Sequence, residues 1–184
     1  RGAGLADVHP ADLGAHVLNA LVDRSGIDPA VVEDVIFGCV DTIGPQAGDI
    51  ARTCWLAAGL PEHVPGTTID RQCGSSQQAV HFAAQAVMSG TADVIVAGGM
   101  ESMSNAPYLL PKARAGQRIG HGLMFDHMMY DGLEDAYSRN EKTADERSSG
   151  TFGEECAAKY GCPRHAHHPL STASGHAPQP ARPP

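Results

Sequence analysis

The segment Thr67–Ala79 (TTIDRQCGSSQQA) places a cysteine at the point where a short apolar run gives way to a helical pattern. We expect a strand that ends near Arg71, a turn at Cys73 and a helix that begins within two residues. A cysteine at a helix N-terminus lies beside unpaired backbone N–H groups and the positive end of the helix dipole, which favour the thiolate over the thiol. The sequence therefore makes Cys73 a candidate nucleophile.

The neighbours of Cys73 suit the same chemistry. Gly74 lets the backbone approach a ligand closely, and Ser75 and Ser76 can satisfy donors of the first helical turn. The backbone N–H groups at Cys73 and Gly74 could donate to an oxyanion that forms on a bound thioester carbonyl. A cysteine beside a glycine also occurs as a purely structural residue, so the local residues alone leave both interpretations open.

The elements around this segment alternate between helices and strands. Helices are predicted by apolar periodicity and by Pro and Gly at their ends, and strands by short apolar runs. The predicted helices are Leu13–Val22 with Pro10 in the first turn and Gly26 as its stop, a short one opened by Asp28 and Pro29, Asp49–Ala58 and Ser75–Met88; the predicted strands are Val35–Val40, Thr67–Arg71 and Asp93–Ala97. This alternation favours an α/β layered fold in which a mixed, largely parallel sheet lies between helices.

Two expectations follow for the parts nearest Cys73. The helix over Gln77–Gly90 is apolar on most sides, so we expect it to be buried between two layers. The segment from Gly98 through Met100 follows a predicted strand and reads GGM, which is typical of a tight turn. We expect Gly98, Gly99 and Met100 to form a scaffold beneath the site rather than to contact substrate.

The composition changes after Tyr108. Residues 109–150 are rich in Gly, Met, Asp and Arg and form a long excursion, a kind of segment that is usually functional, before a helix over Phe152–Tyr160. Residues 162–184 contain no acidic residue and are rich in Pro, which predicts a disordered tail. We therefore expect a core over residues 1–108, a partial loop domain over 109–161 and a tail over 162–184.

The overall composition excludes several classes of function. The net charge of −8 argues against binding to nucleic acid. No apolar run approaches the roughly 20 residues that span a bilayer, so we expect a soluble, cytoplasmic protein without a membrane partner. The five cysteines contain no CxxC pair, which favours free thiols over disulfides or zinc. His165, His167 and His168 lack Cys or carboxylate partners, so no metal site is expected.

Two motifs then carry a specific resemblance. The segments TIDRQCGSSQQAV and DVIVAGGMESMSNAPY resemble the thiolase family, which comprises acetyl-CoA acetyltransferases and 3-ketoacyl-CoA thiolases. Supporting pieces lie in order on both sides: VEDVIFGCV and ARTCWLAAGLPEHVPG before them, MMYDGLEDAY and FGEECAAKYG after them. The resemblance covers about Leu5–Gly161.

The resemblance implies an acyltransferase that works through an acyl-cysteine on Cys73, by thiolytic cleavage of a 3-ketoacyl-CoA or Claisen condensation of acetyl-CoA, as in fatty acid metabolism. Coenzyme A would be a substrate, no cofactor would be needed, and the excursion would begin a loop domain that cradles CoA. The backbone N–H of Cys73, with support from Gly74, would form part of an oxyanion hole. A homodimer would form through the Thr67–Arg71 region.

The chain also departs from the family pattern. It is expected to be an N-terminal half only, without the first strand and without the Asn-Glu-Ala-Phe, Gly-His-Pro and Cys-Gly-Gly segments that complete the site, and Ser148–Gly150 replaces a His-Met-Gly segment. The composition from Cys162 onward is that of a shifted reading frame in a GC-rich gene. A catalytically incompetent fragment that dimerises or binds CoA is therefore one alternative. A β-ketoacyl synthase is another, and the GGMESMS segment argues against it.

Overall fold

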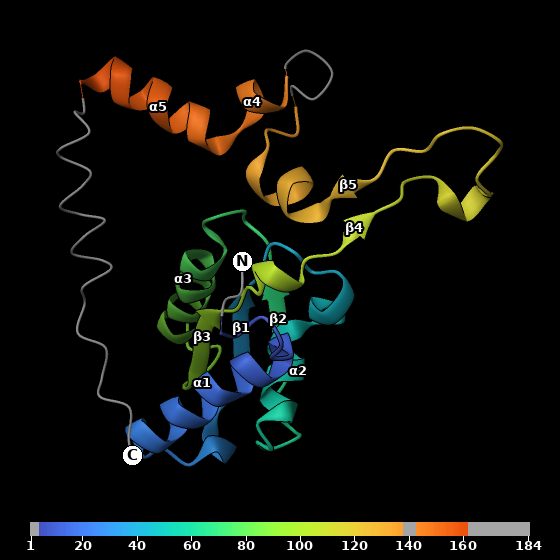
Figure 1. The fold of residues 1–184 in the computed structure, drawn as a ribbon. Coiled ribbons are helices and arrows are strands. Elements are labelled where there is room, and N and C mark those ends of the chain that lie inside the picture. Colours follow the sequence, from blue (N-terminus) through green and yellow to red (C-terminus); the bar gives the residue numbers. More distant parts are fainter. Residues whose placement is uncertain (1–3, 138–142, 162–184) are drawn as a thin grey trace. The chain divides into compact units, whose positions relative to one another are not determined.

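The computed structural model describes residues 4–137 and 143–161, which belong to two compact units that divide between Gly132 and Leu133. The first unit is built on a parallel sheet of three strands in the order β2-β1-β3 (Figure 1): β1 (Asp34–Gly38), β2 (Gly66–Ile69) and β3 (Ile95–Gly99). Val35 of the central strand lies opposite Gly66 on one side and Val96 on the other. The predicted parallel sheet is confirmed, while the predicted boundary at residue 108 stays a prediction.

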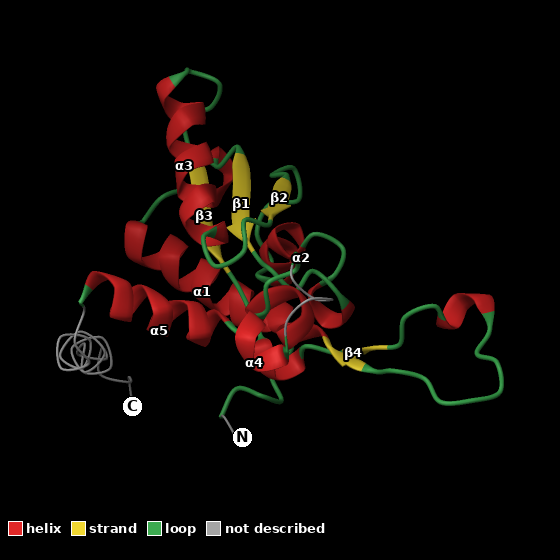
Figure 2. Ribbon diagram, turned by 90° about the horizontal axis from the view of Figure 1, so that it is seen from above, coloured by secondary structure: helices red, strands yellow, loops and turns green. Residues whose placement is uncertain are grey.

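Helices cover both faces of this sheet (Figure 2). One face packs against α1 (Pro10–Ser25) and α2 (Ile50–Ala57), and the other against α3 (Ser75–Met88). Successive residues of a strand point to opposite faces, so Val35 and Phe37 join the core on the α1/α2 side while Gly38 meets α3. The first unit is thus a layered α/β fold, as the sequence predicts.

The main hydrophobic core lies between the sheet and the α1/α2 pair. Its largest fully buried side chain is Trp55 of α2, whose indole Nε1 donates to the carbonyl of Pro61 over 2.9 Å. Leu18, Ile50 and Val64 are buried with it. A buried aromatic ring with its one polar atom satisfied is a strong contribution to stability, and it fixes the position of α2 against the sheet.

The ends of the helices follow from the sequence. The ring Nδ1 of His9 accepts from Ala11 N–H at the start of α1, and Gly26 ends the helix at φ 67°. The predicted short helix is a 3-10 turn over Pro29–Val31, and Asp28 caps it. Asp49 caps α2 in the left-handed region, with its carboxylate also accepting from Thr68 Oγ1 at 2.6 Å.

The expectation that the helix after Cys73 is buried between two layers is wrong for the described chain. On α3 only Ser75, Gln78 and Ala79 are buried, all on the side that faces the sheet. Large apolar side chains are exposed on the same helix: Val80, Phe82, Val87 and Met88. The sequence predicts the apolar character correctly, but the described residues supply a covering layer on one side of α3 only.

The chain beyond β3 forms short elements. A 3-10 turn at Met103–Asn105 comes first, and strands β4 (Tyr108–Leu109) and β5 (Phe125–Asp126) then pair antiparallel, with a 3-10 turn at Ala113–Ala115 between them and a π-helix at Met128–Leu133 after them. Another 3-10 turn, at Gly44–Gln46, lies earlier in the chain, between β1 and α2. The second unit holds α4 (Ala144–Arg147) and α5 (Ser149–Tyr160), and Arg147 pairs with Glu134 at 3.1 Å. The predictions of a disordered tail over residues 162–184 and of no metal site at its histidines concern residues outside the described part of the chain.

Candidate active site

The candidate nucleophile lies on a five-residue turn between β2 and α3. The strand ends at Ile69, the helix begins at Ser75, and Gly74 is its N-cap residue. The turn is closed by two backbone hydrogen bonds, Gly74 N–H to the Arg71 carbonyl at 3.1 Å and Ser75 N–H to the Gln72 carbonyl at 3.0 Å. The placement of Cys73 at the end of a strand and immediately before a helix is therefore as predicted.

The thiol of Cys73 is free and exposed. No side chain caps α3, because the N-cap residue is a glycine and makes no side-chain hydrogen bond. The first N–H groups of a helix have no partner within the helix. An exposed thiol beside uncapped N–H groups is an arrangement that can attack a carbonyl carbon and donate to the oxygen that becomes negative.

The first turn of α3 is packed against two glycines of the sheet. A Cβ atom at Gly38 of β1 would come closer than 3.0 Å to the backbone of Ser75 and Ser76, and one at Gly99 of β3 would clash with the side-chain Oγ of Ser76. We call Gly38 and Gly99 the glycine seat. Because only hydrogen atoms stand between this helix and the strands, the seat fixes how far α3 lies from the sheet.

The predicted tight turn at Gly98 and Gly99 is wrong. Both glycines belong to β3, where they pair with Phe37 and Gly38 of β1. Met100 follows the strand, and its N–H donates to the Gly38 carbonyl at 3.1 Å. The close approach of α3 explains Gly99, because a Cβ atom there would clash with Ser76 Oγ, whereas a Cβ atom at Gly98 would have room. A sequence shows the same letters for glycines in a turn and in a strand.

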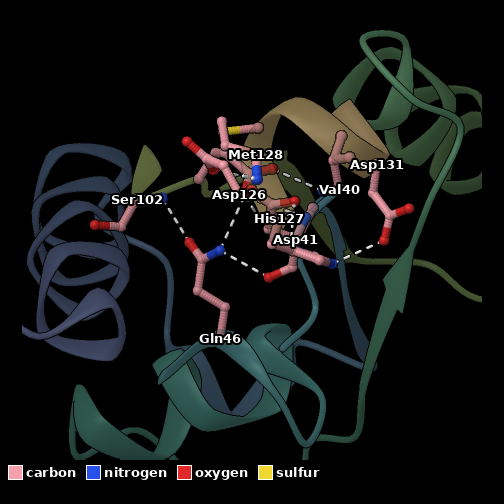
Figure 3. A network of polar contacts seen from close by, with 10 residues as sticks. Val40, Asp41, Gln46, Ser102, Asp126, His127, Met128 and Asp131 are labelled. Atoms are coloured by element: carbon pink, nitrogen blue, oxygen red, sulfur yellow. Dashed lines mark hydrogen bonds and ion pairs between the residues drawn. The ribbon is translucent and has the colours of Figure 1, made fainter. Parts of the chain in front are cut away.

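A polar network lies at the carboxyl ends of β1 and β3, the same edge of the sheet as the Cys73 turn (Figure 3). The carboxylate of Glu101 accepts from Val40 N–H at 2.7 Å, from Asp41 N–H at 3.3 Å and from Gln46 Nε2 at 2.9 Å. Gln46 also donates to the Asp41 carbonyl at 2.8 Å. Glu101 thus ties the loop after β1 to the loop after β3.

His127 belongs to the same network. Its Nδ1 lies 2.9 Å from Oδ1 of the fully buried Asp41, and its Nε2 lies 2.8 Å from Oδ2 of Asp131 (Figure 3). Burial raises the pKa of Asp41 against the attraction of His127, and burial together with Glu101 raises the pKa of the Cys39 thiol to about 12. Both ring nitrogens of His127 face carboxylates, so we do not assign this histidine as a base for Cys73.

A cavity of about 540 Å³ opens in the β4–β5 region. Its wall includes the basic side chains of Lys112, Arg118 and His121 and the rings of Phe125 and Tyr130. None of the residues of the Cys73 turn line it, so it is not part of the candidate nucleophilic site.

The network of Asp41, Gln46, Glu101 and His127 was not among the residues that the sequence singled out. Glu101 stands in the GGMES motif and could have been flagged there. The contact between Asp41 and His127 joins positions that are far apart in the chain, and no spacing in a single sequence signals it.

This chain belongs to the thiolase family. The model of the thiolase N-terminal domain matches residues 1–177. The chain is 68% identical over 107 residues to the steroid 3-ketoacyl-CoA thiolase FadA6 of Mycobacterium tuberculosis. These residues make up 58% of this chain and 26% of that protein. The chain is 44% identical over 163 residues to an acetyl-CoA acetyltransferase of Chromobacterium violaceum, 89% of this chain and 40% of that protein.

A solved structure agrees with these relatives. The crystal structure of the Bacillus anthracis acetyl-CoA acetyltransferase superposes with a TM-score of 0.76 at 38% identity, covering 89% of this chain and 39% of that one. The chain therefore spans between about a quarter and two fifths of the length of these relatives. Among the described residues, no helix is both long and apolar enough to cross a membrane.

Proposed function

We propose that this chain carries the nucleophilic part of a thiolase, with Cys73 as the residue that takes the acyl group. The observation that carries the proposal is the exposed Cys73 thiol at the uncapped N-terminus of α3. Acyl transfer from a thioester requires a sulfur nucleophile and donors for the developing oxyanion, and the turn offers both within a few residues.

On acetyl-CoA the proposed step is transfer of the acetyl group from the CoA sulfur to the Cys73 sulfur. The Cys73 sulfur bonds to the thioester carbonyl carbon, the backbone N–H of Cys73 donates to the oxyanion, and the carbon–sulfur bond to CoA breaks. The N–H of Gly74, expected from the sequence to support the oxyanion, instead donates to the Arg71 carbonyl. The proton of Cys73 leaves with the CoA thiolate as free CoA. With a 3-ketoacyl-CoA the sulfur attacks the keto carbon instead, the adjacent carbon–carbon bond breaks, and the acetyl-CoA carbanion takes the proton.

The higher identity to a protein named 3-ketoacyl-CoA thiolase supports thiolytic cleavage as the direction. The acyl-cysteine then passes its acyl group to the thiol of a second CoA. We further propose, as the family resemblance implies, that two copies pair through the Thr67–Arg71 region, since β2 is an outer strand of the described sheet. Sedimentation of the purified chain over a range of concentrations tests this pairing, and a single monomeric species throughout would exclude it.

A second candidate is a chain that binds CoA or pairs with a copy of itself without acyl transfer. It is favoured by one observation: within the described ranges no side chain hydrogen-bonds the Cys73 sulfur, so no base is in place to take its proton. Groups that act as a unit lose most of their effect when one is missing. Acylation by the isolated chain is therefore expected to be slow.

Incubating the purified chain with acetyl-CoA separates the two candidates. The proposal expects one acetyl group on the peptide that contains Cys73, seen by mass spectrometry, and none on that peptide in Cys73→Ala. Cys156→Ala is the matched control, because Cys156 is an exposed free cysteine on α5, and this variant should keep the acetylation. Equal labelling of Cys73 and Cys156 would indicate unspecific chemistry and refute the proposal.

A further inference from the structure

The geometry points to Ser75 as a positioning residue for Cys73: its hydroxyl clamps the turn that presents the sulfur. This inference rests on the proposed role of Cys73, and it concerns how the sulfur is held rather than what it reacts with. Ser75 is the first residue of α3 and is 4% exposed. The hydrogen bonds of its hydroxyl go to the backbone of the turn, so it acts through the turn.

The hydroxyl of Ser75 makes two hydrogen bonds across the turn. It accepts from the N–H of Arg71 at 2.8 Å and donates to the carbonyl of Gln72 at 2.6 Å. These two residues directly precede Cys73. The oxygen of the buried Ser75 therefore bonds both ends of the two-residue segment Arg71–Gln72 that leads to the nucleophile. The sequence suggests a different role for Ser75, namely to cap the first helical turn, and that role is not what the hydroxyl does.

The residue between the two bonds is held in an unfavourable conformation. Gln72 has φ 50°, in the left-handed region that side chains other than glycine seldom adopt. The N–H of Gln72 also donates to Oδ1 of Asp70 at 2.7 Å. A strained residue persists only where its surroundings over-determine its conformation, and the Ser75 hydroxyl supplies one of these restraints from the helix side.

The helix that carries Ser75 is packed tightly against the sheet. The backbone of Ser75 and Ser76 lies against the glycine seat, so the first turn of α3 is fixed relative to β1 and β3. A second link runs from the same strand end to the helix, since Nη1 of Arg71 donates to Oε1 of the buried Gln78. The position of Cys73 is therefore set by the sheet through Ser75.

Alkylation by iodoacetamide tests this inference without any acyl-CoA. Cys73 is already exposed, so its alkylation rate reports how the turn holds the sulfur beside the N–H groups of the helix N-terminus more than it reports access. In the full chain, Ser75→Ala should slow alkylation of the Cys73 peptide about fivefold at neutral pH. The rate at Cys156 serves as the internal reference and should not change.

Ser76→Ala is the matched control. It removes a hydroxyl from the next residue of the same helical turn, one that makes no hydrogen bond to the Cys73 turn, and it should leave the rate at Cys73 unchanged. Ser75→Thr keeps the hydroxyl and should restore most of the rate. Trp55 is the only tryptophan and is fully buried, so its fluorescence reports whether each variant keeps its core.

The outcomes are distinct. A Cys73 rate in Ser75→Ala that stays within twofold of wild type, or that rises, overturns the inference, as does an equal loss in Ser76→Ala. Should Ser75→Thr lose the Trp55 signal through crowding against the glycine seat, the comparison of Ser75→Ala with Ser76→Ala still decides. Failure of acetyl-CoA to label wild-type Cys73 would remove the proposed function while leaving the alkylation result intact.

Discussion

Replacing Gly38 by alanine introduces a methyl group where the backbone of α3 already lies. The new Cβ would come closer than 3.0 Å to the Ser76 nitrogen and to the Ser75 carbonyl carbon. Both are backbone atoms, so neither can rotate away as the end of a side chain would. The helix and β1 must separate, and the contacts on both sides of the sheet loosen.

The expected loss follows from measured costs of overpacking, which are typically 1–3 kcal/mol. Because the obstacle is backbone, we place Gly38→Ala at the upper end, about 3 kcal/mol less stable than wild type. For a chain of this size that corresponds to a midpoint of thermal unfolding lower by roughly 6–12 °C. The change also moves Ser75, so the alkylation rate of Cys73 should fall in the same variant.

The matched control is Gly98→Ala, on the neighbouring strand and one residue from the glycine seat. There the new Cβ would meet only Phe37 Cε1, at an ordinary 3.7 Å, and a strand residue without positive φ gains about 0.5 kcal/mol from replacing glycine. Thermal unfolding followed by circular dichroism compares the three proteins. A midpoint for Gly38→Ala within 1–2 °C of wild type, on the order of 0.5 kcal/mol, would show that α3 is not held at this distance and refute the seat.

Three further outcomes are expected. Burial raises the pKa of Cys39 to about 12 and of Cys54 to about 11. At about pH 8, mass spectrometry should therefore find both thiols unmodified by iodoacetamide while Cys73 reacts. Early labelling of Cys39 or Cys54 would contradict their burial. Burial also raises the pKa of Asp41, so the native state holds this proton more tightly than the unfolded chain. The contribution of this proton to the free energy of unfolding is complete below about pH 4 and is lost as the pH rises through the raised pKa of Asp41. Urea unfolding at several pH values should therefore show a smaller loss of stability with rising pH in Asp41→Asn than in wild type. The same dependence of the free energy of unfolding on pH in both proteins would contradict this prediction. Trp55→Ala removes the largest buried side chain and its hydrogen bond, which should cost roughly 3–5 kcal/mol by urea unfolding followed by circular dichroism, and a loss below about 1 kcal/mol would mean that the core closes over the gap.

The sequence predicts the elements of the core because each has a local signal. The bounds of α3 coincide with the prediction, since Gly74 and Ser75 mark its start and the apolar pattern runs to Met88. The strands are predicted in the right places but with shifted ends: β1 stops at Gly38 rather than Val40. An apolar run shows which residues are buried, and strand pairing with β2 and β3 decides which of them are hydrogen-bonded.

The site could be predicted only as far as its local part. Cys73 follows from the pattern of one segment, but the clamp by Ser75 depends on the conformation of the turn, in which a serine that suits a helix cap bonds backward instead. Gly38 shows no signal at all, because the reason for its missing side chain is a helix that begins far along the chain. The pairing of Asp41 with His127 likewise depends on how distant segments meet.

The exposed apolar row on α3 has a consequence for handling the protein. Val80 and Val87 are seven residues apart, on one side of the helix, and are each about half exposed, and Met88 beside them is 87% exposed. Apolar surface of this kind promotes self-association. We expect the chain to bind hydrophobic dyes while fully folded, and to engage chaperones that recognise apolar segments. Its lifetime in a cell would then be governed by quality control acting on a native surface, so the amount of chain present would vary with chaperone supply even when its stability does not change.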